Sequence, residues 1–130
     1  GEKRAEEQYP LKSFFDAGII VTTACDYPVT TVPTPLLAIQ RAVMRQLPNQ
    51  PETALNKKEC VTIEQMIEAT TLNGAYQFKC EDKLGSITVG KQADLVVLDS
   101  DITTCKPENI ADTKVLRTMV GGEWVFTSVD

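Results

Sequence analysis

Apolar and polar positions follow a helical pattern in two stretches near the start of the chain. Within residues 10–18 and 34–46, apolar side chains recur at three- and four-residue steps, which predicts two amphipathic helices. Between them, the run IIVTT at residues 19–23 is β-branched without interruption, which is typical of a strand buried on both faces. Gly18 opens this run and Pro28 closes it. The pattern therefore predicts a helix, a buried strand and a second helix in that order.

The middle of the chain predicts a further helix over residues 62–74, because Thr62 and Gln65 have the spacing of a capping box. Another short helical turn is expected at residues 75–78. Beyond it, short β-rich runs separated by glycine predict strands instead. These strands are expected at residues 86–89, 93–98, 115–120 and 123–127, with Gly121 and Gly122 as a two-residue hairpin turn.

The predicted order of elements makes the chain an α+β fold, with α/β character at its beginning and antiparallel β at its end. A lone strand at residues 19–23 would leave backbone donors and β-branched side chains open to water. We expect it to join the sheet of the later strands, with the helices that begin at Thr34 and Thr62 packed over one face. Pairing of this strand with that of a second copy across a two-fold axis is the alternative.

Composition places the chain among globular proteins, since 42% of its 130 residues are hydrophobic and 24% are charged. The net charge of −5 argues against nucleic acid as a partner, because phosphate binding needs a basic face. No apolar run is long enough for a membrane span, so we expect none. A glycine stands at position 1, which suggests that the native protein begins elsewhere, and no signal peptide is visible.

Four cysteines at positions 25, 60, 80 and 105 match no zinc-binding spacing and include no C-x-x-C pair. We favour a reduced, cytoplasmic chain over a disulfide-bonded one. Cys25 ends the apolar run and is interpreted as a small buried hydrophobe. The chain has no histidine, the residue that most catalytic bases and zinc sites use. A complete metal site would therefore have to be built from aspartate, glutamate and cysteine alone.

Asp26 is the candidate functional residue, since it lies just past the end of the predicted buried strand. Ligands of parallel α/β folds bind at the carboxyl ends of strands, so an ionisable carboxylate there can take part in chemistry. The alternative is that the Asp26 side chain caps the turn that follows it. The two interpretations differ in what the carboxylate contacts.

Beyond these local patterns, the chain resembles the amidohydrolase superfamily of metal-dependent hydrolases. The stretch LGSITVGKQADLVVLD at residues 84–99 looks like the carboxy-terminal signature of that superfamily. The helix motifs at residues 62–66 and 69–75 and the closing TMVGGEWV at residues 118–125 occur in the family's order. The resemblance extends over residues 9–126 and is strongest to the YtcJ-like subgroup. The chain thus resembles a carboxy-terminal fragment of such an enzyme.

The resemblance implies a division of the chain into three parts. Residues 1–58 would be the end of a (β/α)8 barrel, with its eighth strand and the following helix. Residues 59–84 would be connecting helices, and residues 85–130 part of a small β-sandwich. Asp26 falls at the family's strand-eight aspartate, which contacts the metal and acts as general base on bound water. Cys25 replaces the serine usual before that aspartate, which raises thiolate ligation as an alternative to packing.

By this resemblance the parent enzyme would use a divalent metal, zinc, and hydrolyse C–N bonds of a small-molecule substrate. The histidines and the lysine or glutamate of the family's other metal positions have no counterpart here, so we expect no metal and no activity in this chain alone. The alternative function is a non-catalytic α+β module that binds a partner or forms a homo-oligomer through exposed strand edges. A third hypothesis is a metal-free enzyme that uses Asp26, Asp82 and Asp94.

Overall fold

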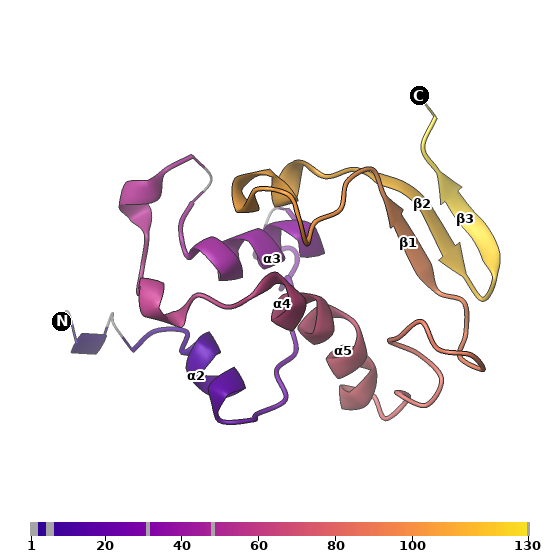
Figure 1. Cartoon of the computed structure of the whole chain (residues 1–130), viewed down its shortest axis with the longest axis horizontal. Coiled ribbons are helices and arrows are strands. Elements are labelled where there is room, and N and C mark those ends of the chain that lie inside the picture. The colour runs from indigo at the N-terminus through magenta and orange to yellow at the C-terminus, as the bar shows by residue number, and fades with distance from the viewer. Residues whose placement is uncertain (1–2, 5–6, 31, 48, 130) are drawn as a thin grey trace.

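The structure is a computed structural model that describes residues 3–4, 7–30, 32–47 and 49–129. Figure 1 shows helices gathered in one part of the molecule and a three-stranded sheet that extends from them toward the carboxy terminus. The longer helices are α2 (Leu11–Asp16), α3 (Pro35–Met44), α4 (Ile63–Thr70) and α5 (Leu72–Gln77). The short 3-10 helices are η1 (Pro51–Thr53), η2 (Lys57–Glu59) and η3 (Pro107–Asp112). The strands are β1 (Leu95–Leu98), β2 (Val115–Val120) and β3 (Glu123–Thr127).

These elements make the chain a mixed α+β protein, as the sequence predicts. The two helices expected near the start are present as α2 and α3. The strands expected at residues 115–120 and 123–127 are present as β2 and β3 with the predicted bounds. Within the described ranges, no helix combines the length and the apolar character that crossing a membrane requires.

α3 begins where the sequence predicts and ends slightly earlier. Thr34 has an extended backbone, and Pro35 occupies the first helical position, where its missing N–H costs no hydrogen bond. The helix ends at Arg45, whose φ of 56° is left-handed. The Arg45 guanidinium then donates at 3.0 to 3.1 Å to three backbone carbonyl oxygens, those of Gln8, Tyr9 and Leu55.

The capping box predicted at the start of α4 is confirmed in both directions. Thr62 Oγ1 accepts from the Gln65 N–H at 3.2 Å, and Gln65 Oε1 accepts from the Thr62 N–H at 2.9 Å. α4 stops at Thr70, because Thr71 departs from helical geometry with φ of −117° and ψ of −86°. The chain then re-enters a helix as α5. The single helix expected over residues 62–74 is therefore two.

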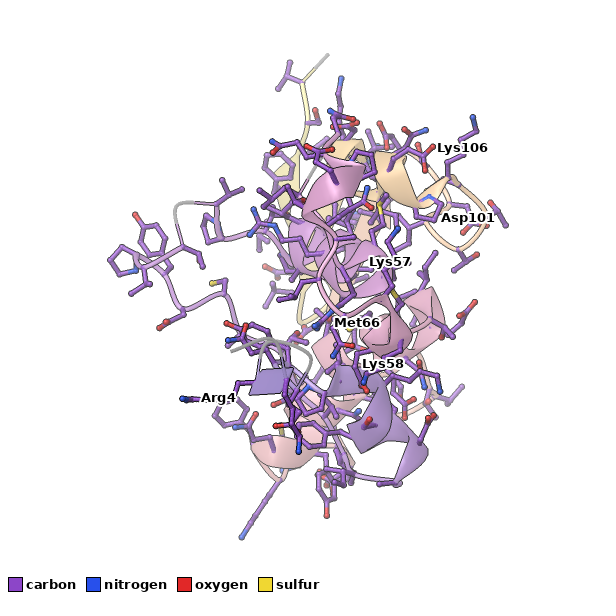
Figure 2. All side chains as sticks on the ribbon, turned by 90° about the vertical axis from the view of Figure 1, so that its left-hand side faces the viewer. Arg4, Lys57, Lys58, Met66, Asp101 and Lys106 are labelled. Atoms are coloured by element: carbon purple, nitrogen blue, oxygen red, sulfur yellow. The ribbon has the colours of Figure 1, made fainter. Side chains whose placement is uncertain are left out.

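The hydrophobic core lies between α3, α4 and η3. Its buried residues include Ile39, Val61, Met66, Ile102 and Ile110. Figure 2 shows Met66 inside the molecule and Lys106 at its margin. Leu98 at the end of β1 packs against this core and so joins the sheet to the helices.

The sheet has the order β1–β2–β3, with both pairs antiparallel. Gly121 and Gly122 have φ of 58° and 87°, so the two-residue hairpin turn predicted from the sequence is confirmed. Asp94 secures this turn, because its Oδ1 accepts from the Gly121 N–H at 2.7 Å. At the other end of β1, Asp99 Oδ1 accepts from the Lys114 N–H at 3.0 Å. Two carboxylates thus fasten the ends of β1 to its neighbour.

Much of the sheet is open to water. Val96, Val125 and Phe126 are all about half exposed or more. Trp124 is 47% exposed, and its ring centroid lies 5.4 Å from the Arg117 guanidinium carbon. Its indole offers a face to a cation at the surface.

The prediction of a strand at residues 86–89 is wrong, because the structure gives this stretch no strand. Ile87 and Val89 are almost fully exposed, so these β-branched side chains find no face to pack on. Just before them, Gly85 has φ of 85° and presses against α5, where a Cβ would lie 2.8 Å from the Ala75 Cβ. The motif is therefore held to the helices through a close backbone approach rather than through strand pairing.

The prediction of a buried strand at residues 19–23 is also wrong. The structure gives this segment no strand, and it pairs with none of β1, β2 and β3. Ile19 and Ile20 are half exposed. The Ile19 N–H donates to the Phe14 carbonyl oxygen, and the other hydrogen bonds of the segment are made with side chains of α4 and α5. The expectation that this run would complete the sheet is therefore overturned.

Candidate functional site

Asp26 lies in the connection between α2 and α3, which stands out from the rest of the molecule in Figure 2. Its φ of 52° is left-handed, a region that aspartate tolerates better than most residues. The Asp26 carbonyl oxygen accepts from the N–H groups of Val29 and Thr30 at 2.8 and 3.3 Å, which closes a turn. The Thr30 hydroxyl closes it further by donating to the Cys25 carbonyl oxygen.

The carboxylate of Asp26 takes no part in this turn. The residue is exposed, and its side chain makes no hydrogen bond or ion pair with any residue that the structure describes. Main-chain N–H groups and the Thr30 hydroxyl close the turn, so the described residues show no cap by the Asp26 side chain. Among the described residues, the Asp26 carboxylate therefore has no partner.

The segment that leads to Asp26 is held by side chains of α4 and α5. Asn73 Nδ2 donates to the Val21 carbonyl oxygen at 3.0 Å, and Asn73 is only 8% exposed. Two further hydrogen bonds join hydroxyl groups of the segment to the same helices, Thr22 to Gln77 at 2.9 Å and Thr23 to Thr70 at 3.4 Å. The position of Asp26 is thus tied to the helices that precede the sheet.

The other acidic candidates do not form a cluster with Asp26. Asp82 is exposed, and Asp94 is engaged with the β2–β3 turn. Among the residues whose placement is described, no group of three or more histidine, cysteine, aspartate or glutamate side chains could hold a metal ion. The part of the chain that the structure describes therefore forms no metal site by itself.

The cysteines are partly buried free thiols. Burial raises the pKa of the Cys60 thiol, which favours its protonated form over the thiolate that binds metals. Cys25 lies directly before Asp26, but the described residues place no set of further ligands beside it. Cys25 itself is only half-buried and is not among the residues that form or pack against the hydrophobic core.

Asp26 lines neither of two surface cavities that the described residues form. The larger has a volume of about 450 Å³ and lies between α3 and η3. Gln40 lines it, and its Nε2 donates to the carbonyl oxygens of Pro107 and Glu108 at 3.1 and 2.5 Å. The smaller cavity, of about 240 Å³, lies beside Arg45. Neither cavity adds a group to the surroundings of Asp26.

A model of the amidohydrolase family matches residues 1–126, which is nearly the whole chain. The chain belongs to the amidohydrolase family. The matched range includes the connection that carries Asp26, the capping box at the start of α4 and the three-stranded sheet. The family membership that the motifs at residues 62–66 and 84–99 indicate is confirmed.

This amidohydrolase chain is 34% identical over 117 residues to an N-substituted formamide deformylase of Arthrobacter pascens, covering 88% of the chain and 20% of that protein. It is 28% identical over 127 residues to YtcJ of Bacillus subtilis, a protein named as an amidohydrolase, covering 97% of the chain and 24% of YtcJ. An amidohydrolase crystal structure from Thermotoga maritima shares the fold, with a TM-score of 0.67 at 23% identity over 91% of the chain and 26% of that structure. The chain thus spans about a quarter or less of the length of the relatives it matches.

The amidohydrolase chain also holds a buried carboxylate that sequence reasoning did not single out. Glu59 accepts from the Ser13 hydroxyl at 2.7 Å and from the Ser13 N–H at 2.8 Å. These two bonds hold the pKa of Glu59 below its usual value of 4.5. Ser13 lies in the first turn of α2, so Glu59 caps that helix from 46 positions away. No local motif signals a pairing over such a distance in sequence.

Proposed function

We propose that this chain is the carboxy-terminal part of a metal-dependent hydrolase that cleaves C–N bonds of a small-molecule substrate, with Asp26 as a reacting group. The free carboxylate of Asp26 is the observation that carries the proposal. It is exposed at the end of a segment anchored to α4 and α5, in a turn closed by main-chain atoms. Family membership supports the assignment, since residue 26 lies within the matched range.

In the whole protein, Asp26 would contact a divalent metal ion, zinc, and accept a proton from the water that attacks the substrate. A carboxylate acts as general base in this way when it lies within hydrogen-bond reach of the proton. A zinc site needs three or four protein ligands, and the described residues supply no such group. This chain alone does not fit a complete metal site, so we assign the remaining ligands to parts of the protein outside these 130 residues.

We base the class of bond cleaved on a relative of the chain. We base the roles of the three parts of the chain on the family. The deformylase relative is named for N-substituted formamides, which contain an amide C–N bond. In the whole protein, residues 1–58 would form the last βα unit of the barrel, residues 59–84 the connecting helices and residues 85–130 part of the β-sandwich. The free cysteines support a reducing, cytoplasmic location.

Asp26→Asn in the full-length protein tests this proposal. Asparagine keeps the size of the side chain but does not accept the proton, so turnover should fall roughly 100-fold or more, the scale for losing a general base. Folding should be unchanged, because the Asp26 carboxylate contacts no described residue. Asp82→Asn is the matched control, since Asp82 is also exposed, and it should keep wild-type turnover. Near wild-type turnover of the Asp26 variant would show that Asp26 is only a turn residue.

A second candidate function, self-association, is favoured by the open sheet. The outer edges of β1 and β3 have no strand partner in the described part of the chain. β3 also carries Trp124, Val125 and Phe126, which are about half exposed or more. An open edge with apolar side chains favours pairing with a second copy. Sedimentation of the purified chain should then show a dimer that Val125→Lys abolishes, whereas a monomer at every concentration would contradict self-association.

A further inference from the structure

The segment that leads to Asp26 has almost no backbone hydrogen bonds of its own. The main-chain N–H groups of residues 20–25 donate to no residue that the structure describes. A segment outside any sheet or helix has no ladder to fix its path, so side chains must supply the anchors. The place of Asp26 therefore depends on which side chains hold this segment, and how firmly.

We propose that Asn73 is a positioning residue for Asp26 and acts through the Val21 carbonyl oxygen. The inference rests on the proposed function, because the anchor matters to the reaction only if Asp26 takes part in it. Asn73 comes from α5, far from Asp26 in sequence, and its hydrogen bond is to Val21 rather than to Asp26 or its turn. It holds the segment five residues ahead of the carboxylate.

Burial makes the Asn73 anchor the strongest of the three. The Asn73 amide is 8% exposed, and its Nδ2 lies 3.0 Å from the Val21 oxygen. Removing a buried donor leaves its acceptor unsatisfied, whereas water replaces an exposed partner at little cost. The Thr22–Gln77 bond is exposed, so its loss should matter much less.

The third contact, between Thr23 and Thr70, is weaker, but it lies closer to Asp26 in the sequence. Thr23 and Thr70 hydroxyl oxygens lie 3.4 Å apart, and the Thr70 hydroxyl already donates to the Met66 carbonyl at 2.6 Å. Three residues beyond Thr23, the turn closed by the Asp26 carbonyl oxygen begins. The Thr23–Thr70 contact therefore leaves only Ala24 and Cys25 between the last contact with α4 and Asp26, which limits how far Asp26 moves.

Backbone order measured by NMR on the purified chain tests this role. In Asn73→Asp, a change of equal size that puts an acceptor against the Val21 oxygen, order parameters of residues 21–26 should fall from about 0.85 to below about 0.6. Those of β1, β2 and β3 should stay at wild-type values, which shows that the chain is folded. Thr22→Val is the matched control and should leave residues 21–26 ordered. Unchanged order in Asn73→Asp, or an equal loss in Thr22→Val, would overturn the proposal.

A backbone ester in place of the Val21–Thr22 amide covers the case in which Asn73→Asp does not fold. The ester keeps every side chain and weakens only the Val21 oxygen as an acceptor, because the Thr22 N–H that it removes has no described partner. It should raise the mobility of residues 21–26 without changing the sheet. An ester variant as ordered as the wild type would overturn the proposal.

Kinetics of the full-length protein separate positioning from mere support of the fold. Asn73→Asp should lower kcat roughly 10- to 100-fold per folded molecule with little change in KM, because a small displacement of a reacting group is costly. An unchanged kcat with a lower unfolding midpoint would mean that Asn73 is only structural. Loss of order in Asn73→Asp together with full turnover in Asp26→Asn would support the anchor and overturn only the role of Asp26.

Discussion

The helical part of the chain and its carboxy-terminal sheet differ in how deeply their apolar side chains are buried. Met66 in α4 is 1% exposed, whereas Val125 in β3 is 62% exposed. Each apolar side chain that is fully buried contributes about 1.5–3 kcal/mol, so the sheet leaves much possible stabilisation unused. The helical part therefore contains the packed core, and the sheet offers apolar surface for further contacts.

The Asp26 connection belongs with the sheet in this comparison. Ile19 and Ile20 are half exposed, and Tyr27 and Val29 are more so. The chain spans about a quarter or less of the relatives it matches, and in a full-length protein we expect both open regions to receive further contacts. Asp26, the candidate reacting group, lies in an open region. The Asn73 side chain that anchors its segment comes from the helical part.

The largest expected effect contrasts one core residue with one sheet residue. Met66→Ala should lower the free energy of unfolding by about 2–5 kcal/mol, because it leaves a cavity in the packed core. Val125→Ala should change it by less than about 0.5 kcal/mol, as expected of an exposed side chain. Urea denaturation of both variants measures the difference. Similar losses in the two would break the distinction between a packed region and an open one.

Two glycines test how closely the chain packs where the helical part meets the sheet. Gly85 and Gly90 both have positive φ, 85° and 94°, but only Gly85 has atoms within 4 Å of where a Cβ would lie. Backbone strain applies to both, and overpacking against α5 adds to it at Gly85. Gly85→Ala should cost about 3 kcal/mol of unfolding free energy and Gly90→Ala about 1 kcal/mol. Equal costs would mean that the 84–91 turn does not press on the helices.

The smallest effect concerns the buried carboxylate of the helical part. The pKa of Glu59 is lowered in the folded chain, so its stabilisation is fully present above the ordinary value of 4.5 and is lost as pH falls through the folded-state pKa. Glu59→Gln should lower the unfolding midpoint near neutral pH and flatten its decline in acid. Glu68→Gln, at an exposed position, should leave both unchanged. An acid profile of Glu59→Gln identical to that of the wild type would exclude this linkage.

Features set by residues a few positions apart were predictable from the sequence. The Thr62–Gln65 capping box and the Gly121-Gly122 hairpin each depend on neighbours, and both are confirmed. The conformation of the β-branched runs at residues 19–23 and 86–89 was not predictable in this way, because a strand needs a partner that a local pattern does not supply. The sequence therefore predicts turns and caps better than pairings.

The candidate site was predictable in identity but not in geometry. Asp26 stood out by its position after an apolar run and by its family resemblance. That its carboxylate makes no hydrogen bond or ion pair with a described residue is shown only by the structure. The anchor through Asn73 joins residues 52 positions apart, and no local spacing signals it.

A structure of the full-length protein with its metal ion bound would show directly whether Asp26 is a metal ligand. We expect an Asp26 carboxylate oxygen about 2.0–2.2 Å from a zinc ion, the distance of a carboxylate ligand. We also expect the hydrogen bond from Asn73 Nδ2 to the Val21 carbonyl oxygen to be retained. A metal ion held entirely by other residues, with the Asp26 carboxylate facing solvent, would contradict the role proposed for Asp26.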